Sequence, residues 1–473
     1  MRYIGNKKKL LDILDKFLIS KKLDKKGLVF CDLFSGTCTV GDYFKNRYKV
    51  IANDTLYFSY AIANGKLKYN SKTFFQKLGF DPFEYFNKIN TDNYVEGFCY
   101  NNFAPEKSGR QYFSDENAKK IDYIRNTIDE WFDKIMIDEN EKYYLIGSLL
   151  ESVSKVSNVA GVYSAYLKIW DSRAVKKMEL IPLETFGDAK YQNEAYHLNA
   201  NELINKISGD ILYLDPPYTA TQYVSQYHVL ETIAKNDSPE THGIGAHRDN
   251  GNQISMWCRK GRVQEEFSRL IENAKFRHIV FSYSDAGIMS KEFIEKVLKR
   301  YAKDGTYFFK EIDFIKYKST RAVKKEIKDN TKEKKHFEWL FYIEKKDDPI
   351  YVSPLNYIGG KYEIVPLIKE NLPKKIDCFY DLFGGGSTVG INVNSTKVVY
   401  NDINWVVRDL LEKISCDDFL STYNYIEKTI KKYGLEKKNK ETYIKFRNYY
   451  NSMEKGSRNP LNLYLLICFG FEH

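Results

Sequence analysis

The residues LVFCDLFSGTCTVGDYFKNRYKVIAND, at positions 28 to 54, decide the fold. LVFCDL and KVIAND, at the two ends, are short apolar runs of the kind that form buried strands, and a glycine-containing turn follows the first of them. We interpret the region between the two runs as a helix. Strand, turn, helix and strand form a βαβ unit, which predicts an α/β fold with a mostly parallel sheet and a ligand at the carboxyl ends of its strands.

The segments after this unit indicate how the chain is divided. Residues 70–199 contain polar and aromatic helical stretches that do not continue the alternation of strands and helices. The alternation resumes with DILYLDPPY (210–218) and RHIVFSYS (277–284), and a late strand pair follows in TYFFKEIDFIKY (306–317) and HFEWLFYIE (336–344). We therefore expect a main domain of residues 1–69 plus 200–347, with an inserted, mainly helical region at 70–199.

Three motifs recur in the same order near the end of the chain. YIGNK (3–7) returns as YIGGK (357–361), DLFSGTCTVG (32–41) as DLFGGGSTVG (381–390), and NDTL (53–56) as NDIN (401–404). The offsets of 354, 349 and 348 residues are far longer than a solenoid repeat, so the pattern predicts two large homologous modules, the second at residues 353–473. At this spacing the counterpart of Asp215 would lie beyond His473, which predicts that the second module is truncated.

Composition and charge argue against several classes of protein. With 43% apolar and 29% charged residues the chain is globular, and its 473 residues allow about three domains. The longest apolar run has eleven residues, fewer than the ~18 that cross a bilayer, so no membrane insertion is expected. Asp12 and Asp15 interrupt any secretion signal, which predicts a cytoplasmic location. Seven cysteines without a CxxC pair predict neither disulfides nor a metal site, and the formal charge of +10 suits an anionic partner.

The glycine turn after the first strand is a candidate ligand site. Asp32 ends the strand, and Gly36 permits a tight turn where a ligand can approach the backbone. The turn follows neither the dinucleotide pattern nor the Walker pattern, and a turn that only packs a helix against the sheet is the alternative. Asp54 ends the next strand, where a carboxylate can bind the two hydroxyls of a ribose. Together these residues indicate a ligand that carries adenosine.

The tetrapeptide DPPY, Asp215 to Tyr218, directly follows the apolar strand ILYL. Pro216 and Pro217 hold the chain extended, so carbonyl groups and side chains have a fixed geometry. Asp215 and the Pro216 carbonyl can accept both hydrogens of a conjugated amino group, which raises the reactivity of its nitrogen. Tyr218 offers a flat face for a stacked base. A rigid surface loop is the alternative, but the preceding strand and the glycine turn favour catalysis.

These motifs occur in the order RYIGNK, DLFSGTCTVG, Asn-Asp, a variable region and DPPY. In this the chain resembles the adenine-specific DNA methyltransferases of the Dam-like group, in particular tandem enzymes of the FokI modification methylase type. The resemblance implies a Rossmann-like fold, S-adenosylmethionine as methyl donor and double-stranded DNA as substrate. The cofactor-binding residues that it implies are Tyr3, Lys7, Asp32, Phe34, Gly36, Asp54 and Asp215. It also implies a second cofactor pocket, without a catalytic loop, at Tyr357, Lys361, Gly384, Gly386 and Asp402.

The expected reaction is methyl transfer to the exocyclic amino group of an adenine turned out of the duplex, with Asp215, Pro216, Pro217 and Tyr218 as the catalytic loop. Two modules suit an asymmetric recognition sequence, because its two strands present different base edges. The resemblance thus implies a restriction-modification system, with a restriction endonuclease as functional partner but no stable complex with it. A catalytically idle DNA-binding protein and an amino-methyltransferase acting on RNA stay open as alternatives.

Two features outside these motifs carry smaller expectations. His228 follows the catalytic loop and is expected to be a structural histidine, since the reaction needs no strong base. The run at 316–335 contains nine basic and three acidic residues and predicts an exposed loop, in which some lysines contact phosphates.

Overall fold

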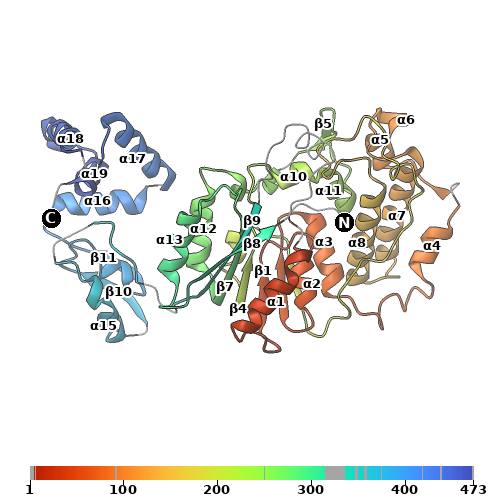
Figure 1. Cartoon of the computed structure of the whole chain (residues 1–473), viewed down its shortest axis with the longest axis horizontal. Helices are drawn as coiled ribbons and strands as arrows, with labels where there is room; N and C mark the ends of the chain where they lie inside the picture. Colours follow the sequence, from red (N-terminus) through yellow and green to blue (C-terminus); the bar gives the residue numbers. More distant parts are fainter. Residues whose placement is uncertain are drawn as a thin grey trace. The chain divides into compact units, whose positions relative to one another are not determined.

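The computed structural model of the chain divides into two compact units, Met1–Asp347 and Asp348–His473 (Figure 1). It describes residues 5, 7–90, 93–249, 251–314, 336–346, 350–355, 359–373, 375–417, 419–436 and 439–470. Tyr3, Tyr357 and the basic run at 316–335 therefore lie outside the described residues. Each unit is described by itself below. No helix in the described part of the chain is long and apolar enough to cross a membrane.

The first unit is built on a seven-stranded sheet in the order β3-β2-β1-β4-β7-β9-β8. Its strands are β1 (Val29–Asp32), β2 (Lys49–Asn53), β3 (Glu194–Tyr196), β4 (Ser208–Leu214), β7 (Lys275–Ser284), β8 (Phe308–Phe314) and β9 (His336–Glu344). The five strands from β3 to β7 run parallel, and β9 is antiparallel to both β7 and β8. The predicted α/β fold with a mainly parallel sheet and a late strand pair is confirmed.

Helices cover both faces of this sheet (Figure 1). On one face, Leu14 and Leu18 share a hydrophobic core with Tyr213 of β4 and Val280 of β7. On the other face, Phe267 packs its ring against Phe281, with the ring centroids 4.8 Å apart. The helices of the sheet layer are α1 (Leu11–Ser20), α2 (Thr39–Phe44), α3 (Tyr57–Leu67), α9 (Ala200–Leu203), α12 (Val263–Asn273) and α13 (Lys291–Tyr301). A sheet buried on both faces explains why its central strands are continuous apolar runs.

Helices make up the regular structure of the described residues between β2 and β3. After α3 they are α4 (Pro82–Lys88), α5 (Phe98–Phe103), α6 (Pro105–Ser108), α7 (Asp115–Asp133) and α8 (Glu139–Val156). Helix α8 begins with a capping box, in which Asp138 accepts from the Glu141 backbone and Glu141 accepts from the Asp138 backbone. Strand β3 lies inside the predicted insert at 70–199 but pairs with β2, so the sheet resumes at Glu194. Its three residues, Glu-Ala-Tyr, are too few and too polar to give an apolar strand pattern.

The inserted helices pack directly on the sheet layer through a glycine contact. A Cβ atom added at Gly65 of α3 would lie only 2.9 Å from the Cα atom of Tyr144 in α8. The two helices therefore approach closely at this point, which only a residue without a side chain allows.

The segment between β4 and α12 returns across the carboxyl edge of the sheet. It contains α10 (Tyr223–Gln226), α11 (His228–Lys235), the short hairpin β5 (Thr241–His242) and β6 (His247–Arg248), and two 3-10 turns at Gly251–Gln253 and Met256–Cys258. Residues of its last turns, from Gln253 to Cys258, return to the region beyond the sheet edge where the first glycine turn lies.

The second unit contains a two-stranded parallel sheet of β10 (Ile376–Asp381) and β11 (Ser395–Tyr400). Its helices are α15 (Val365–Glu370), α16 (Trp405–Cys416), α17 (Phe419–Tyr433), α18 (Lys440–Ser452) and α19 (Pro460–Phe469). Residues 461–469 of the apolar run thus belong to α19, where Leu461 and Leu465 are buried. Single turns of 3-10 helix occur in the two units at Lys8–Leu10, Tyr362–Ile364, Gly390–Asn392 and Lys455–Ser457.

Candidate active site

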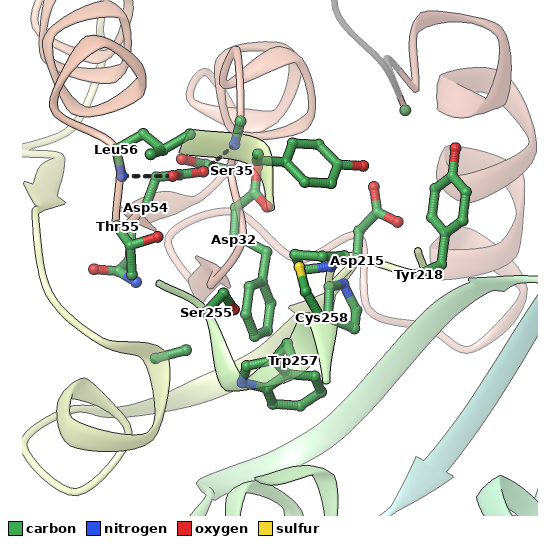
Figure 2. Close-up of a pocket in the computed structure, with 18 of the residues that line it drawn as sticks. Asp32, Ser35, Asp54, Thr55, Leu56, Asp215, Tyr218, Ser255, Trp257 and Cys258 are labelled. Carbon is green, nitrogen blue, oxygen red and sulfur yellow. Dashed lines mark hydrogen bonds between the residues drawn. The ribbon is translucent and has the colours of Figure 1, made fainter. Parts of the chain in front are cut away.

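One pocket opens at the carboxyl ends of β1, β2 and β4, where the strand order changes direction. Its open volume is about 1070 Å³, part of which is open to solvent. It brings together all the described site residues predicted for the first module: Lys7, Asp32, Phe34, Gly36, Asp54, Asp215, Pro216, Pro217 and Tyr218. In Figure 2, Asp54 lies toward one side of the pocket, and Asp215 and Tyr218 lie toward the other. A ligand-sized space therefore joins the glycine turn to the DPPY loop.

The glycine turn is fixed by two carboxylates. Asp54 Oδ2 accepts a hydrogen bond from the Gly36 backbone N–H (3.0 Å). Asp54 Oδ1 accepts one from the Leu56 N–H (2.9 Å), as Figure 2 shows. Asp32 Oδ2 accepts from the Gly41 N–H at the start of α2 (3.2 Å). The turn needs left-handed backbone at two positions, Gly36 (φ 50°) and Cys38 (φ 53°). Both acidic side chains thus hold the turn in one conformation.

Burial changes the proton affinity of these two carboxylates. It raises the pKa of Asp32 to about 8, and the negative charge of Asp215 adds to the rise. It also raises the pKa of Asp54 to about 6, although the backbone hydrogen bonds to Asp54 oppose the change. The pocket therefore holds negative charge at an energetic cost, which a positively charged ligand would reduce.

Asp215 follows β4 directly and forms an ion pair within the pocket wall. The Lys7 ammonium lies 3.0 Å from Asp215 Oδ1, and the Asp215 side chain is 15% exposed. Burial raises the pKa of Asp215 to about 7; the positive charge of Lys7 opposes the rise and the negative charge of Glu338 adds to it. Burial also acts against the charge of Lys7, but Asp215 and Glu338 outweigh it and raise the pKa of Lys7 above its ordinary value. Asp215 is thus an ionisable acceptor beside a permanent cation.

Sequence analysis missed Glu338, which completes this cluster. Glu338 lies in β9, is 4% exposed and forms a short ion pair with Lys7. Ser282 Oγ in β7 also donates to Glu338 Oε1, at 2.5 Å. The sequence does contain a signal for it, because Glu338 falls on the same strand face as Leu340 and Tyr342, which are buried in the core. A charged residue in that alternation indicates an inward-facing carboxylate with a partner.

A second wall that sequence analysis missed comes from residues 253–258. The rings of Phe34 and Trp257 meet edge to face, with centroids 4.9 Å apart. Trp257 Nε1 donates to Asn201 Oδ1 (3.3 Å), which fixes the orientation of the indole. Residues 253–258 match none of the motifs that the sequence analysis used. Trp257 thus adds a second aromatic ring beside Phe34 to the pocket lining.

Tyr218 and His228 differ in their exposure to the pocket. Tyr218 lines the pocket, its backbone carbonyl accepts from the Ile288 N–H (3.1 Å), and burial raises its pKa. His228 is buried in the helical core, where its Nε2 lies 2.8 Å from the Tyr163 carbonyl oxygen. Burial lowers the pKa of His228 to about 3, and the neighbouring His247 adds to the decrease. His228 is not among the lining residues of the pocket, which agrees with the predicted structural role.

The second unit repeats the hydrogen bonds of the first glycine turn. Asp402 Oδ2 accepts from the Gly385 N–H (2.8 Å), Asp402 Oδ1 accepts from the Asn404 N–H (2.8 Å), and Asp381 Oδ2 accepts from the Gly390 N–H (3.1 Å). The left-handed positions are Gly385 (φ 50°) and Ser387 (φ 58°). Gly385 thus matches Gly36, and Gly384 and Gly386, predicted as cofactor-binding residues, flank it. Lys361, the counterpart of Lys7, is exposed.

Comparison with known proteins agrees with this arrangement. The family model described as D12 class N6 adenine-specific DNA methyltransferase matches residues 3–297 and 357–471. The Type II methyltransferase M.FokI of Planomicrobium okeanokoites is 40% identical over 497 residues, which cover 100% of this chain and 75% of that relative. The modification methylase StsI of Streptococcus sanguinis is 37% identical over 496 residues, covering 100% and 74%. The Type II methyltransferase M.NlaIII of Neisseria lactamica is 38% identical over 350 residues, covering 73% of this chain and 99% of that relative.

Proposed function

The chain belongs to the D12 class of N6 adenine-specific DNA methyltransferases, and we propose that methyl transfer takes place in the pocket between the Gly36 turn and the loop Asp215–Tyr218. The observation that carries this proposal is that both motifs line the same pocket. A donor held at the turn and an adenine held at the loop would then meet inside it. The fold is that of a Rossmann-like methyltransferase, with ligands at the carboxyl ends of parallel strands.

The pocket suits S-adenosylmethionine, which supplies a methyl group on a positively charged sulfur when it is bound. The carboxylate oxygens of Asp54 accept backbone hydrogen bonds from Gly36 and Leu56, and a carboxylate has about four acceptor sites, which leaves room for a ribose hydroxyl. Phe34 offers an aromatic face beside the turn. The carboxylates of Asp32 and Asp215 favour a cationic ligand. Tyr3 and Lys7 complete the proposed binding residues at the start of the chain.

Asp215 and the Pro216 carbonyl are proposed to accept the two hydrogens of the adenine amino group. This draws the nitrogen lone pair away from the ring, so the nitrogen becomes more nucleophilic. Pro217 keeps the loop extended, and Tyr218 stacks against the extruded base. The amino nitrogen forms the new bond to the methyl carbon while the carbon–sulfur bond breaks, and one amino proton is then lost to water.

We assign target recognition to the inserted helical region, predicted at 70–199 and helical between Pro82 and Val156 in the described residues. The relatives named above are Type II methyltransferases and modification methylases, which supports a place in a restriction-modification system. A restriction endonuclease that cuts the same site would be the functional partner. The enzyme would act in the cytoplasm, where the host DNA lies.

The first unit is proposed to be the complete enzyme, with residues 1–69 and 200–347 as its catalytic domain. M.NlaIII matches about the length of this unit and is itself covered to 99%. The second unit, predicted at 353–473, is proposed to be a partial second copy. Its turn at Gly385, with Asp402, repeats the hydrogen bond that Asp54 accepts from Gly36 in the first unit.

Replacement of Asp215 tests the proposed role of the loop. In Asp215→Ala, transfer of a tritiated methyl group from S-adenosylmethionine to duplex DNA should fall by at least about a hundredfold, because one acceptor of the amino hydrogens is lost. Asp304→Ala, at a side chain that is 100% exposed, is the control and should keep wild-type turnover. Near-normal turnover of folded Asp215→Ala would overturn the assignment. Labelling of RNA in place of DNA by the wild-type chain would favour the alternative substrate.

A further inference from the structure

The residue of interest is Glu338, a buried carboxylate that lies far along the chain from the motifs of the family but contacts Lys7 in the structure. It lies in the antiparallel strand β9, 4% exposed, between β7 and β8. Its Oε1 accepts from both Lys7 and Ser282. A buried charge with two directed partners is costly to remove and fixes the positions of those partners.

Lys7 pairs with two carboxylates that come from different strands of the sheet. Its ammonium group contacts Glu338 in β9 and lies 3.0 Å from Oδ1 of Asp215, which follows β4. The Lys7 carbonyl accepts from the Leu10 N–H (2.8 Å), which anchors the backbone at the start of the first 3-10 turn. The position of the ammonium group relative to Asp215 therefore depends on Glu338.

We propose that Glu338 is a positioning residue for methyl transfer. It holds the ammonium group of Lys7 beside Oδ1 of Asp215, and it limits how far the charge of Lys7 neutralises the Asp215 carboxylate. Without Glu338, the ammonium group is free to pair fully with Asp215. A fully paired carboxylate is a weaker acceptor for the adenine amino hydrogens, and it is also less well placed to receive them. This inference rests on the proposed role of Asp215.

Several charged or titratable groups face Asp215 from the elements around it. They are Lys7, Asp32 at the end of β1, Tyr213 in β4, Glu338 in β9, and Tyr218 and Tyr223 after the loop. Burial raises the pKa of the three tyrosines, which keeps them neutral at neutral pH, and Lys7 stays charged. Asp215 and Asp32 are thus the groups that change charge near neutral pH. Glu338 raises the pKa of Asp215, so its removal should lower that pKa.

The test is Glu338→Gln in the full chain, with methyl transfer to duplex DNA measured as kcat and KM across pH. We expect kcat to fall by about tenfold to a hundredfold, with a smaller change in the KM for S-adenosylmethionine. The working form of Asp215 is ionised, so activity rises with pH through the pKa of Asp215. In Glu338→Gln the rising part of the curve of kcat against pH, here called the acid limb, should move to lower pH. A variant that only lost structural support would not show this shift.

Glu344→Gln is the matched control on the same strand. Glu344 pairs with Arg277 at 2.9 Å on the protein surface and does not touch Lys7 or Asp215. It should leave both kcat and the acid limb unchanged. A Glu338→Gln enzyme with wild-type kcat and an unmoved limb would overturn the inference.

A second variant keeps the test valid if Glu338→Gln folds poorly because Lys7 loses its partner. In the double variant Lys7→Gln with Glu338→Gln, the cation and its carboxylate are removed together, so no unpaired charge is added by the second change. If Glu338 acts through Lys7, the double variant should be no slower than Lys7→Gln alone. Additive losses would contradict that route.

The two proposals fail in different ways. If Asp215→Ala retains turnover, the proposed function of the loop fails, whatever Glu338 does. If Asp215→Ala is inactive but Glu338→Gln behaves as the wild type, only the positioning role of Glu338 is overturned.

Discussion

Among the described lining residues of the pocket, Lys7 is the single lysine or arginine, whereas Asp32, Asp54 and Asp215 all face the same space. Burial raises the pKa of all three carboxylates. A cation that enters the pocket favours their ionised forms and therefore lowers these pKa values again. Binding of a sulfonium donor and ionisation of Asp215 should thus support each other. The charges of the lining residues therefore favour a positively charged ligand.

Asp54 provides a prediction about the donor side of the pocket. Asp54→Ala removes both acceptors that hold Gly36 and Leu56 and also removes the proposed ribose contact. We expect the KM for S-adenosylmethionine to rise by about tenfold to a hundredfold, since hydrogen bonds to a charged group contribute about 1.5–3 kcal/mol. Steady-state methyl transfer at varied donor concentration measures this.

Asp402→Ala is the matched control for Asp54→Ala, because Asp402 makes the same two hydrogen bonds in the second unit. It should leave methyl transfer unchanged, since Asp402 is not among the residues that line the pocket of Asp215. An unchanged KM in Asp54→Ala would mean that Asp54 only braces the turn.

Single site residues were predictable from the sequence where they follow a recognisable apolar strand. Asp54 and Asp215 each end a strand that is apolar enough to recognise, so their meeting at the sheet edge could be expected. Glu338 and Trp257 come from a late strand and an irregular segment. Their contact with the site depends on the pairing of β9 with β7 and on the return of the chain after α11, which no local pattern encodes.

At the scale of elements, apolar content decided which strands could be predicted. The central strands are buried on both faces and read as continuous apolar runs, whereas the edge strand β3 has three residues and a polar start. The composition of the insert predicted its helical character. It did not predict how the inserted helices pack on the helices of the sheet layer. Helix α8 meets α3 at Gly65, a contact between segments about eighty residues apart in the chain.

The contact at Gly65 leads to a prediction about stability. Gly65→Ala should lower the free energy of unfolding by about 1–3 kcal/mol, because the new Cβ atom overpacks against the Tyr144 backbone. Helix propensity alone predicts the opposite sign, a gain of about 1 kcal/mol. Thermal unfolding measures the difference. Gly161→Ala, where a Cβ atom meets nothing within 4 Å, is the control, and a stabilised Gly65→Ala would show that the helices are not in close contact.

At the scale of the whole molecule, each of the two units contains a glycine turn with the same hydrogen bonds. The first copy shares its pocket with Asp215, and the second repeats the hydrogen bonds at Asp381 and Asp402. Two modules are useful when the two strands of a recognition sequence differ in their base edges. The duplicated turn therefore suits an asymmetric recognition sequence.

Strand-resolved sequencing of modified bases tests the central claim most directly, in DNA from a host that expresses the full chain and otherwise lacks adenine methylation. The account predicts N6-methyladenine at one asymmetric sequence, and its absence when the Asp215→Ala variant replaces the wild type. Modified cytosine, or an unchanged pattern in Asp215→Ala, would contradict it.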